Sequence, residues 1–250
     1  MFRNLVDLRA DASGAWTFRA TPRICSGQGI LFGGINVGAA ATAVEEALGT
    51  SVALMDARFL RPVRIDDDVR VTIETIDGSA RRGCEVIAYV ADHIVLKLDC
   101  RLPGRPGPER IFAVRALTPP PQECPPRDYA SPPVGTVAEL LDVRLSPSSK
   151  PEEGSVVMWA RLADARADDA GSLVVLADHV PYAVRLTTPD VRRLRTVAST
   201  LQLVDVNASD WVQLDVTIDA VAAGLAHGSI RMWAPDGRLV ATGFQTVAVD

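Results

Sequence analysis

Lysine is nearly absent from this sequence, since Lys97 and Lys150 are the only two in 250 residues. The net charge is −5 at pH 7, and the arginines are scattered except for a short cluster at Arg192, Arg193 and Arg195. A nucleic-acid partner requires a basic surface that neutralises phosphates. We therefore expect no nucleic-acid partner.

The sequence also lacks metal-site spacing and any long apolar run. Its four cysteines form no C-x-x-C pair, so no metal site is expected. No segment reaches the roughly 20 apolar residues that span a bilayer. The N-terminal segment MFRNLVDLRADASG carries charges where a signal peptide needs apolar residues. We expect a cytoplasmic protein with reduced thiols and no membrane partner.

The segment Gly33–Leu48 is the clearest element that is present. It reads GGINVGAAATAVEEAL, and Gly49 follows it. Glycine adopts the left-handed conformation that ends helices, and a helix that is apolar nearly all round must be buried. Small residues along it allow close approach of other backbones. We predict a central helix that the rest of the chain must enclose.

Strand patterns follow this helix from residue 51 to residue 102. Apolar residues alternate with polar ones over residues 69–76 and again over residues 94–102, which is the period of a half-buried strand. A sheet curled around one helix is the predicted result.

A proline-rich segment then separates two similar halves. Residues 118–133 contain seven prolines in sixteen positions, which excludes helix and central strand. VRVTIETID from Val69 resembles VQLDVTIDA from Val212, and a second helix is predicted over residues 171–184. Residues 192–197 are predicted as a short helix or turn. We expect repeats at 1–117 and 138–250, a linker at 118–137, and edge-to-edge pairing of the two sheets.

Three motifs give this arrangement a family resemblance. They are Phe32-Gly33-Gly34, Phe59-Leu60-Arg61-Pro62 and DGRLVATGFQ, which ends at Gln245. The chain resembles the acyl-CoA thioesterase II family, a tandem double hot-dog. The resemblance implies an α+β double hot-dog fold, hydrolysis of acyl-CoA to a carboxylic acid and CoA in fatty acid metabolism, no cofactor, and assembly into a homo-oligomer.

Asp178 is the predicted catalytic residue. It ends the run Leu176-Ala177-Asp178, seven positions after Gly171. This spacing resembles that of phenylacetyl-CoA-type hot-dog thioesterases, in which the carboxylate activates water or attacks the thioester. The resemblance implies that an N–H at Gly171 or Gly34 binds the oxyanion, because helix N-termini carry free donors and positive potential. The alternative is a structural carboxylate that is hydrogen-bonded across the interface between subunits or between the two halves.

Two glutamines complete the predicted site. Gln245 matches the water-holding glutamine of the thioesterase II family, although a polar strand-edge role is the alternative. Gln202 stands where that family has its aspartate, and it is predicted to orient water. Residues 220–223 (AVAA) replace the family's Thr or Ser. This departure leaves a non-catalytic acyl-CoA- or lipid-binding protein as the alternative function. A hot-dog hydratase is a further enzyme alternative, but the Asp/His or His/Glu pairs of that class are not apparent.

Overall fold

The long apolar helix lies at the centre of the first half of the molecule. A computed structural model describes residues 2–78, 81–104, 110–128, 134–163, 169–206 and 210–250. In it, helix α2 runs from Gly33 to Leu48, and Gly49 follows with φ 63°. Both predicted ends are confirmed. Gly49 adopts the left-handed conformation because glycine carries no Cβ that would oppose it.

The described strands form one antiparallel sheet of twelve, in the order β1-β2-β4-β5-β6-β3-β9-β12-β11-β10-β8-β7. The strands are β1 Arg9–Ala10, β2 Trp16–Arg19, β3 Leu54–Phe59, β4 Asp68–Gly78, β5 Arg81–Val90, β6 His93–Arg101, β7 Leu141–Leu145, β8 Ser155–Leu162, β9 Leu194–Leu203, β10 Val212–Ala222, β11 Leu225–Trp233 and β12 Leu239–Val249. Strand β4 continues to Gly78 and β5 begins at Arg81, and the connection between them falls outside the described residues.

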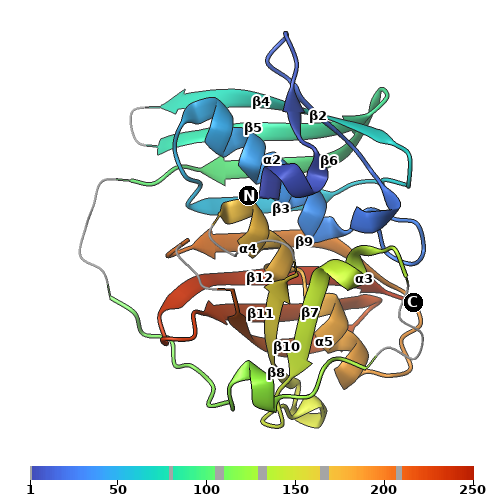
Figure 1. Ribbon diagram of the computed structural model, residues 1–250, viewed down its shortest axis with the longest axis vertical. Coiled ribbons are helices and arrows are strands. Elements are labelled where there is room, and N and C mark those ends of the chain that lie inside the picture. Colours follow the sequence, from blue (N-terminus) through green and yellow to red (C-terminus); the bar gives the residue numbers. More distant parts are fainter. Residues whose placement is uncertain (1, 79–80, 105–109, 129–133, 164–168, 207–209) are drawn as a thin grey trace.

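The helices pack against this sheet and against one another. They are α1 Phe2–Val6, α2, α3 Val137–Leu140, α4 Ala170–Ala177 and α5 Val180–Thr187, with 3-10 turns at Pro22–Ile24, Pro121–Glu123 and Pro151–Glu153. In Figure 1 the first half lies above the second. The halves join where β3 pairs with β9, which confirms the predicted edge-to-edge contact. The architecture is the expected α+β double hot-dog.

The second helix is interrupted, in contrast to the single helix predicted over residues 171–184. Helix α4 ends at Ala177, and α5 begins at Val180. Pro181 explains the break, because proline has no N–H to donate and its ring clashes with the carbonyl four residues earlier, here that of Ala177. Asp178 therefore caps the C-terminus of α4, with φ −80° and ψ 52°.

The prediction of a short helix or turn over residues 192–197 is wrong. Strand β9 begins at Leu194 and pairs with β12 from Val249 onward. Thr196 and Val197 are β-branched, and such residues favour strands once a partner strand is present. The pairing contains an irregularity beside Thr196, between Thr246 and Val247 of β12.

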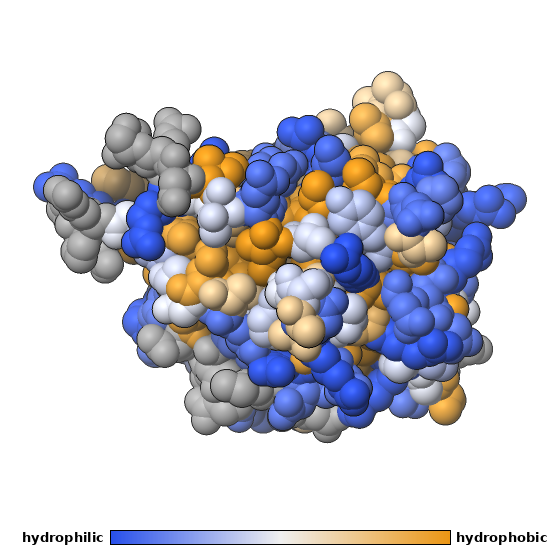
Figure 2. All heavy atoms as spheres, turned by 90° about the horizontal axis from the view of Figure 1, so that it is seen from above, coloured by the Kyte–Doolittle hydropathy of each residue, from blue (hydrophilic) through white to orange (hydrophobic). Residues whose placement is uncertain are grey.

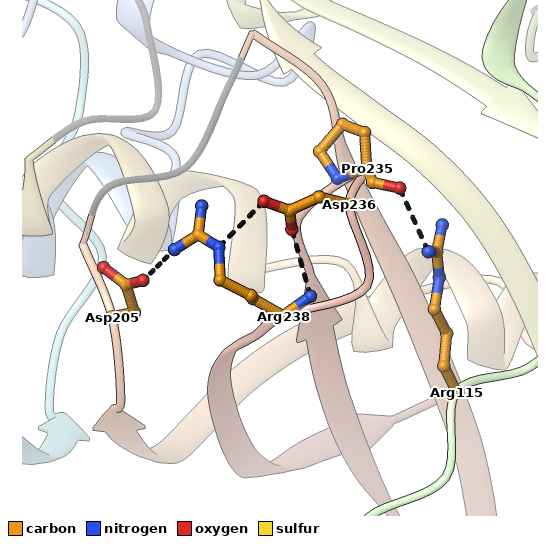
Figure 3. Close-up of polar contacts among 5 residues, drawn as sticks. All are labelled: Arg115, Asp205, Pro235, Asp236 and Arg238. Atoms are coloured by element: carbon orange, nitrogen blue, oxygen red, sulfur yellow. Dashed lines mark hydrogen bonds and ion pairs between the residues drawn. The ribbon is translucent and has the colours of Figure 1, made fainter.

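The segment between the halves packs on the outer face of the sheet, over the strands of the second half. Arg115 donates to Gln213 Oε1 at 2.6 Å and to the carbonyl of Pro235 at 3.2 Å. Figure 3 shows the bond from Arg115 to Pro235 beside the turn at Asp236, where Arg238 binds the carboxylates of Asp236 and Asp205. The crossover is thus held by specific polar contacts.

The molecular surface carries apolar side chains among charged ones, as Figure 2 shows for the end formed by the first half. No helix among the described residues is both long and apolar enough to cross a membrane. All four cysteines lie among the described residues, where they are buried and form no disulfide bond.

Candidate functional site

The site is created by close antiparallel packing of α2 and α4. A Cβ on Gly38 would lie 2.8 Å from the carbonyl oxygen of Gly171, and a Cβ on Gly34 would lie 2.9 Å from the Cα of Val175. Only glycine permits this approach, since real Cβ atoms do not come so close. The packing places the N-terminus of α2 against the C-terminus of α4.

Asp178 lies at this junction and is only 7% exposed. Its Oδ2 accepts a hydrogen bond from the N–H of Gly34 at 2.7 Å. Its Oδ1 accepts one from Gln245 Nε2 at 3.0 Å and one from Thr196 Oγ1 at 3.4 Å. Donors from both halves of the molecule therefore converge on one carboxylate.

Burial raises the pKa of Asp178 above its usual value of 3.8, and the hydrogen bonds from Gln245, Gly34 and Thr196 oppose that rise. Burial disfavours the charged form, whereas hydrogen-bond donors favour it. A raised pKa brings a carboxylate closer to the range in which a general base works best at neutral pH.

Gln245 lies beside Asp178, as a shared site requires. It is 4% exposed, and its Oε1 accepts from the N–H of Val180 at 3.3 Å. Both ends of the amide are thus engaged, one by Asp178 and one by the start of α5. This arrangement holds the amide in a single orientation.

Thr196 was not among the predicted site residues. The sequence of residues 192–197 predicts a helix or turn. In neither structure would Thr196 lie on the inner face of a strand. In the structure Thr196 pairs with Val247, a buried residue two positions from Gln245. Strict alternation from Ser199, the partner of Gln245, would point Thr196 outward, and the irregularity in the pairing beside it turns this hydroxyl toward the site.

The N-terminus of α2 provides open donors next to Asp178. Its N-cap residue, Phe32, makes no side-chain capping bond, so the first N–H groups depend on other acceptors. Gly34 donates to Asp178, and within the described part of the chain the N–H of Gly33 has no acceptor. A Cβ on Gly33 would lie 2.9 Å from Asp178 Oδ2 and 3.3 Å from the ring of Phe59. An oxygen that develops negative charge would be stabilised here.

Gly171 is not part of this junction, contrary to the prediction. It lies seven residues before Asp178, which is about 10 Å along a helix. Phe2 and Thr42 fill the space beside it, each 2.6 Å from where a Cβ would be. The N-cap of α4 is also satisfied, since Asp169 accepts from the N–H of Ser172 at 2.7 Å.

Gln202 does not reach the site either. Its neighbours Leu201 and Leu203 are buried, whereas Gln202 is exposed. Successive strand residues point to opposite faces, so Gln202 projects from the outer face while Asp178 lies on the inner one. We therefore remove Gln202 from the candidate site.

His179 follows Asp178 but does not act as a base. It is 1% exposed, and its Nδ1 lies 2.9 Å from the carbonyl oxygen of Leu176. Burial, reinforced by Arg127, lowers its pKa to about 3. The ring therefore stays neutral at physiological pH.

Comparisons with known proteins identify the family of this chain. A family model described as the acyl-CoA thioesterase C-terminal domain matches residues 121–249, just over half of the chain. No curated protein matches the sequence.

Solved structures share the whole fold at low identity. A hot-dog protein of unknown function from Alicyclobacillus acidocaldarius is 17% identical, with a TM-score of 0.88 and coverage of 100% of this chain and 97% of its own. An acyl-CoA thioesterase II, TesB2, from Mycobacterium marinum is 17% identical, with a TM-score of 0.79 and coverage of 100% and 98%. A tesB protein from Mycobacterium avium subs paratuberculosis is 16% identical, with a TM-score of 0.83 and the same coverage. At such identities the likeness concerns the fold, whereas the family match is to the sequence itself. The chain therefore belongs to the acyl-CoA thioesterase family.

Proposed function

We propose that Asp178 is the general base with which this thioesterase hydrolyses acyl-CoA. The observation that carries the proposal is the buried carboxylate of the second half against the open N-terminus of α2 from the first half. Burying a carboxylate in apolar surroundings destabilises the fold unless hydrogen bonds compensate for its lost hydration. Such a residue is otherwise retained because it has a function. Perturbed groups of this kind concentrate at functional sites.

In the proposed reaction Asp178 accepts a proton from water as the water oxygen attacks the thioester carbonyl carbon. The carbonyl oxygen becomes an oxyanion and accepts a hydrogen bond from the N–H of Gly33, beside that of Gly34. The intermediate then collapses, the carbon–sulfur bond breaks, and the proton passes from Asp178 to the CoA thiolate. The products are the free acid and CoA, and Asp178 is regenerated.

Gln245 and Thr196 are proposed to orient the Asp178 carboxylate. Both donate to Oδ1, and a fixed carboxylate directs its proton-accepting lone pair more effectively than a mobile one. The three side chains are a carboxylate, an amide and a hydroxyl. The thioesterase II resemblance implies the same three chemical types, although some of them come from other sequence positions in this chain. Their presence together favours hydrolysis over the binding-only alternative.

Free-thiol release from a panel of acyl-CoAs of increasing chain length tests this proposal. Asp178→Asn is expected to lower kcat/KM by about 10²- to 10⁴-fold, the range for loss of a general base. Gln245→Ala should lower it as well, whereas Gln202→Ala is the matched control and should retain activity. If Asp178→Asn keeps wild-type turnover, the reaction proceeds elsewhere.

We further infer a cytoplasmic homo-oligomer built from repeats at 1–117 and 138–250 with a linker at 118–137. Four unbridged cysteines support a reducing compartment. Among the described residues, none pairs with the stretch of β4 beyond Val71 on its β2 side, and open strand edges favour association. Light scattering across protein concentrations tests the assembly, and a mass equal to one chain throughout would exclude it.

A further inference from the structure

Two of the four cysteines face one another across neighbouring strands of the first half. Cys84 lies on β5 and Cys100 on β6, and the antiparallel pairing places them directly opposite each other. Residues opposed in this way have Cα atoms about 4.5–5.5 Å apart, within the range of about 4.4–6.8 Å that a disulfide bond spans. The backbone therefore already has the spacing that a bond between these two sulfurs requires.

The two thiols also contact one another. Both side chains are only 1% exposed within the hydrophobic core. The Cys100 thiol donates a hydrogen bond to the sulfur of Cys84, which lowers the pKa of Cys84 although burial opposes it. The same bond, burial and the carboxylates of Asp99 and Glu45 raise the pKa of Cys100. Because the thiolate is the reactive form of cysteine, Cys84 is the nucleophile of the pair and Cys100 retains its proton.

The other two cysteines have different surroundings. Cys25 forms an isolated strand bridge with Leu31, and burial raises its pKa to about 11. The sulfur of Cys124 donates to the carbonyl oxygen of Pro119 at 3.6 Å. A raised pKa keeps a thiol protonated and unreactive. We therefore expect Cys25 and Cys124 to stay reduced under conditions that oxidise the opposed pair.

The opposed pair lies in the first half's counterpart of the candidate site. Strands β3 and β9 are the joining strands of the two halves. On β3, Met55 pairs with Cys100, and on β9, Ser199 pairs with Gln245. A thiol thus stands in the first half where the second half has the amide beside Asp178. The chemistry of the thiol pair is therefore separate from the reaction assigned to Asp178.

We propose that Cys84 and Cys100 form a reversible disulfide bond when the enzyme meets a peroxide, and that this bond holds β5 to β6. The thiolate of Cys84 attacks one oxygen of the peroxide, the O–O bond breaks, and a sulfenic acid forms as hydroxide leaves. The sulfur of Cys100 then attacks the sulfenic sulfur. The S–S bond forms, and the sulfenic oxygen leaves as water with the proton of the Cys100 thiol. Two thiols are oxidised, and one hydrogen peroxide is reduced to two molecules of water.

The expected effect of the bond is stabilisation of the first half. A bond between Cys84 and Cys100 closes a loop that contains the β5–β6 hairpin, and such a closure restricts the unfolded chain. We expect the oxidised protein to melt about 5 °C or more above the reduced protein. In a reducing compartment, disulfides of this kind are transient and respond to oxidants.

Peptide mapping after peroxide treatment tests the proposal. The native enzyme is exposed to hydrogen peroxide, the peroxide is removed with catalase, and the protein is unfolded and alkylated with iodoacetamide. Cys25 and Cys124 should be alkylated, whereas Cys84 and Cys100 should appear in one pair of disulfide-linked peptides. Treatment with dithiothreitol before alkylation should restore all four alkylation sites.

Single substitutions supply matched controls. Cys25→Ala removes a buried thiol outside the pair and should form the bond as the wild type does. Cys84→Ala and Cys100→Ala each remove one member, so neither should form an intramolecular disulfide or melt higher after peroxide treatment. The map of the wild-type protein needs no substitution, and it decides the outcome even where a variant fails to fold.

Four alkylated cysteines, after a treatment that fully oxidises free glutathione, would overturn the proposal. A disulfide that involves Cys25 or Cys124 would overturn it as well. So would a sulfinic or sulfonic acid at Cys84 with Cys100 still alkylated, because the second thiol would then not reach the sulfenic acid. Equal melting temperatures for oxidised and reduced wild-type protein would refute the role of the bond in holding β5 to β6.

Discussion

At the scale of single residues, the protonation of Asp178 should set the acid limit of activity. Because burial raises its pKa above 3.8, the carboxylate takes up a proton at a higher pH than an ordinary aspartate does. We expect kcat/KM to fall as the pH drops through this raised value. A pH–rate profile measures it, and a midpoint at or below 3.8 would contradict the role of general base.

Thr196 provides a second prediction at this scale. Thr196→Val removes a donor that stabilises the carboxylate, so the pKa of Asp178 should rise further and the acid limb should move to higher pH, by about one unit or less. Thr196→Ser keeps the hydroxyl and should restore the wild-type profile. A purely structural Thr196 would instead lower activity equally at every pH.

At the scale of elements, the site depends on how closely α2 and α4 pack. Gly38→Ala would place a methyl group 2.8 Å from the carbonyl oxygen of Gly171, a backbone atom that cannot move without shifting α4. We expect a loss of about 1–3 kcal/mol in the free energy of unfolding, together with reduced activity, because Asp178 moves with α4.

Denaturant unfolding with a matched glycine variant tests that prediction. Gly104→Ala adds the same methyl group where no atom lies within 4 Å and the backbone φ is not positive, so its stability should change by less than about 0.5 kcal/mol. Equal stabilities for the two variants would mean that the helices separate at little cost.

At the scale of the whole molecule, the crossover segment is held to the second half through Asp215. Its carboxylate accepts from the N–H of Ala116 at 2.9 Å, from Gln213 Nε2 at 2.7 Å and from Trp233 Nε1 at 2.9 Å. Asp215→Ala strands these buried donors and should cost about 1–3 kcal/mol or more. Asp219→Ala, on the exposed part of the same strand, should be nearly neutral in thermal unfolding. Similar melting temperatures for the two variants would show that the segment does not need this anchor.

Much of the fold follows from local pattern. Residues 33–48 are helical in sequence and structure alike, because small apolar residues and the terminal Gly49 act within one element. Alternation over residues 69–76 likewise lies within β4, since side-chain period is a property of a single strand. The similarity of the halves predicted an edge-to-edge join, because each half leaves one edge that needs a partner. The structure shows that β3 and β9 form this join.

The sequence by itself thus determined the central helix and the sheet wrapped around it. The resemblance implied that Asp178 and Gln245 belong to one site, but it placed Gln202 and Gly171 there as well. Only the tertiary structure decided which atoms meet. It brought the N–H of Gly34 to a carboxylate 144 residues away, turned Thr196 inward and Gln202 outward, and enclosed Gly171 behind Phe2. Contacts of this kind depend on how elements that are far apart in the sequence pack together, and on where the register of a strand pair shifts. Neither propensity nor periodicity within one segment contains that information.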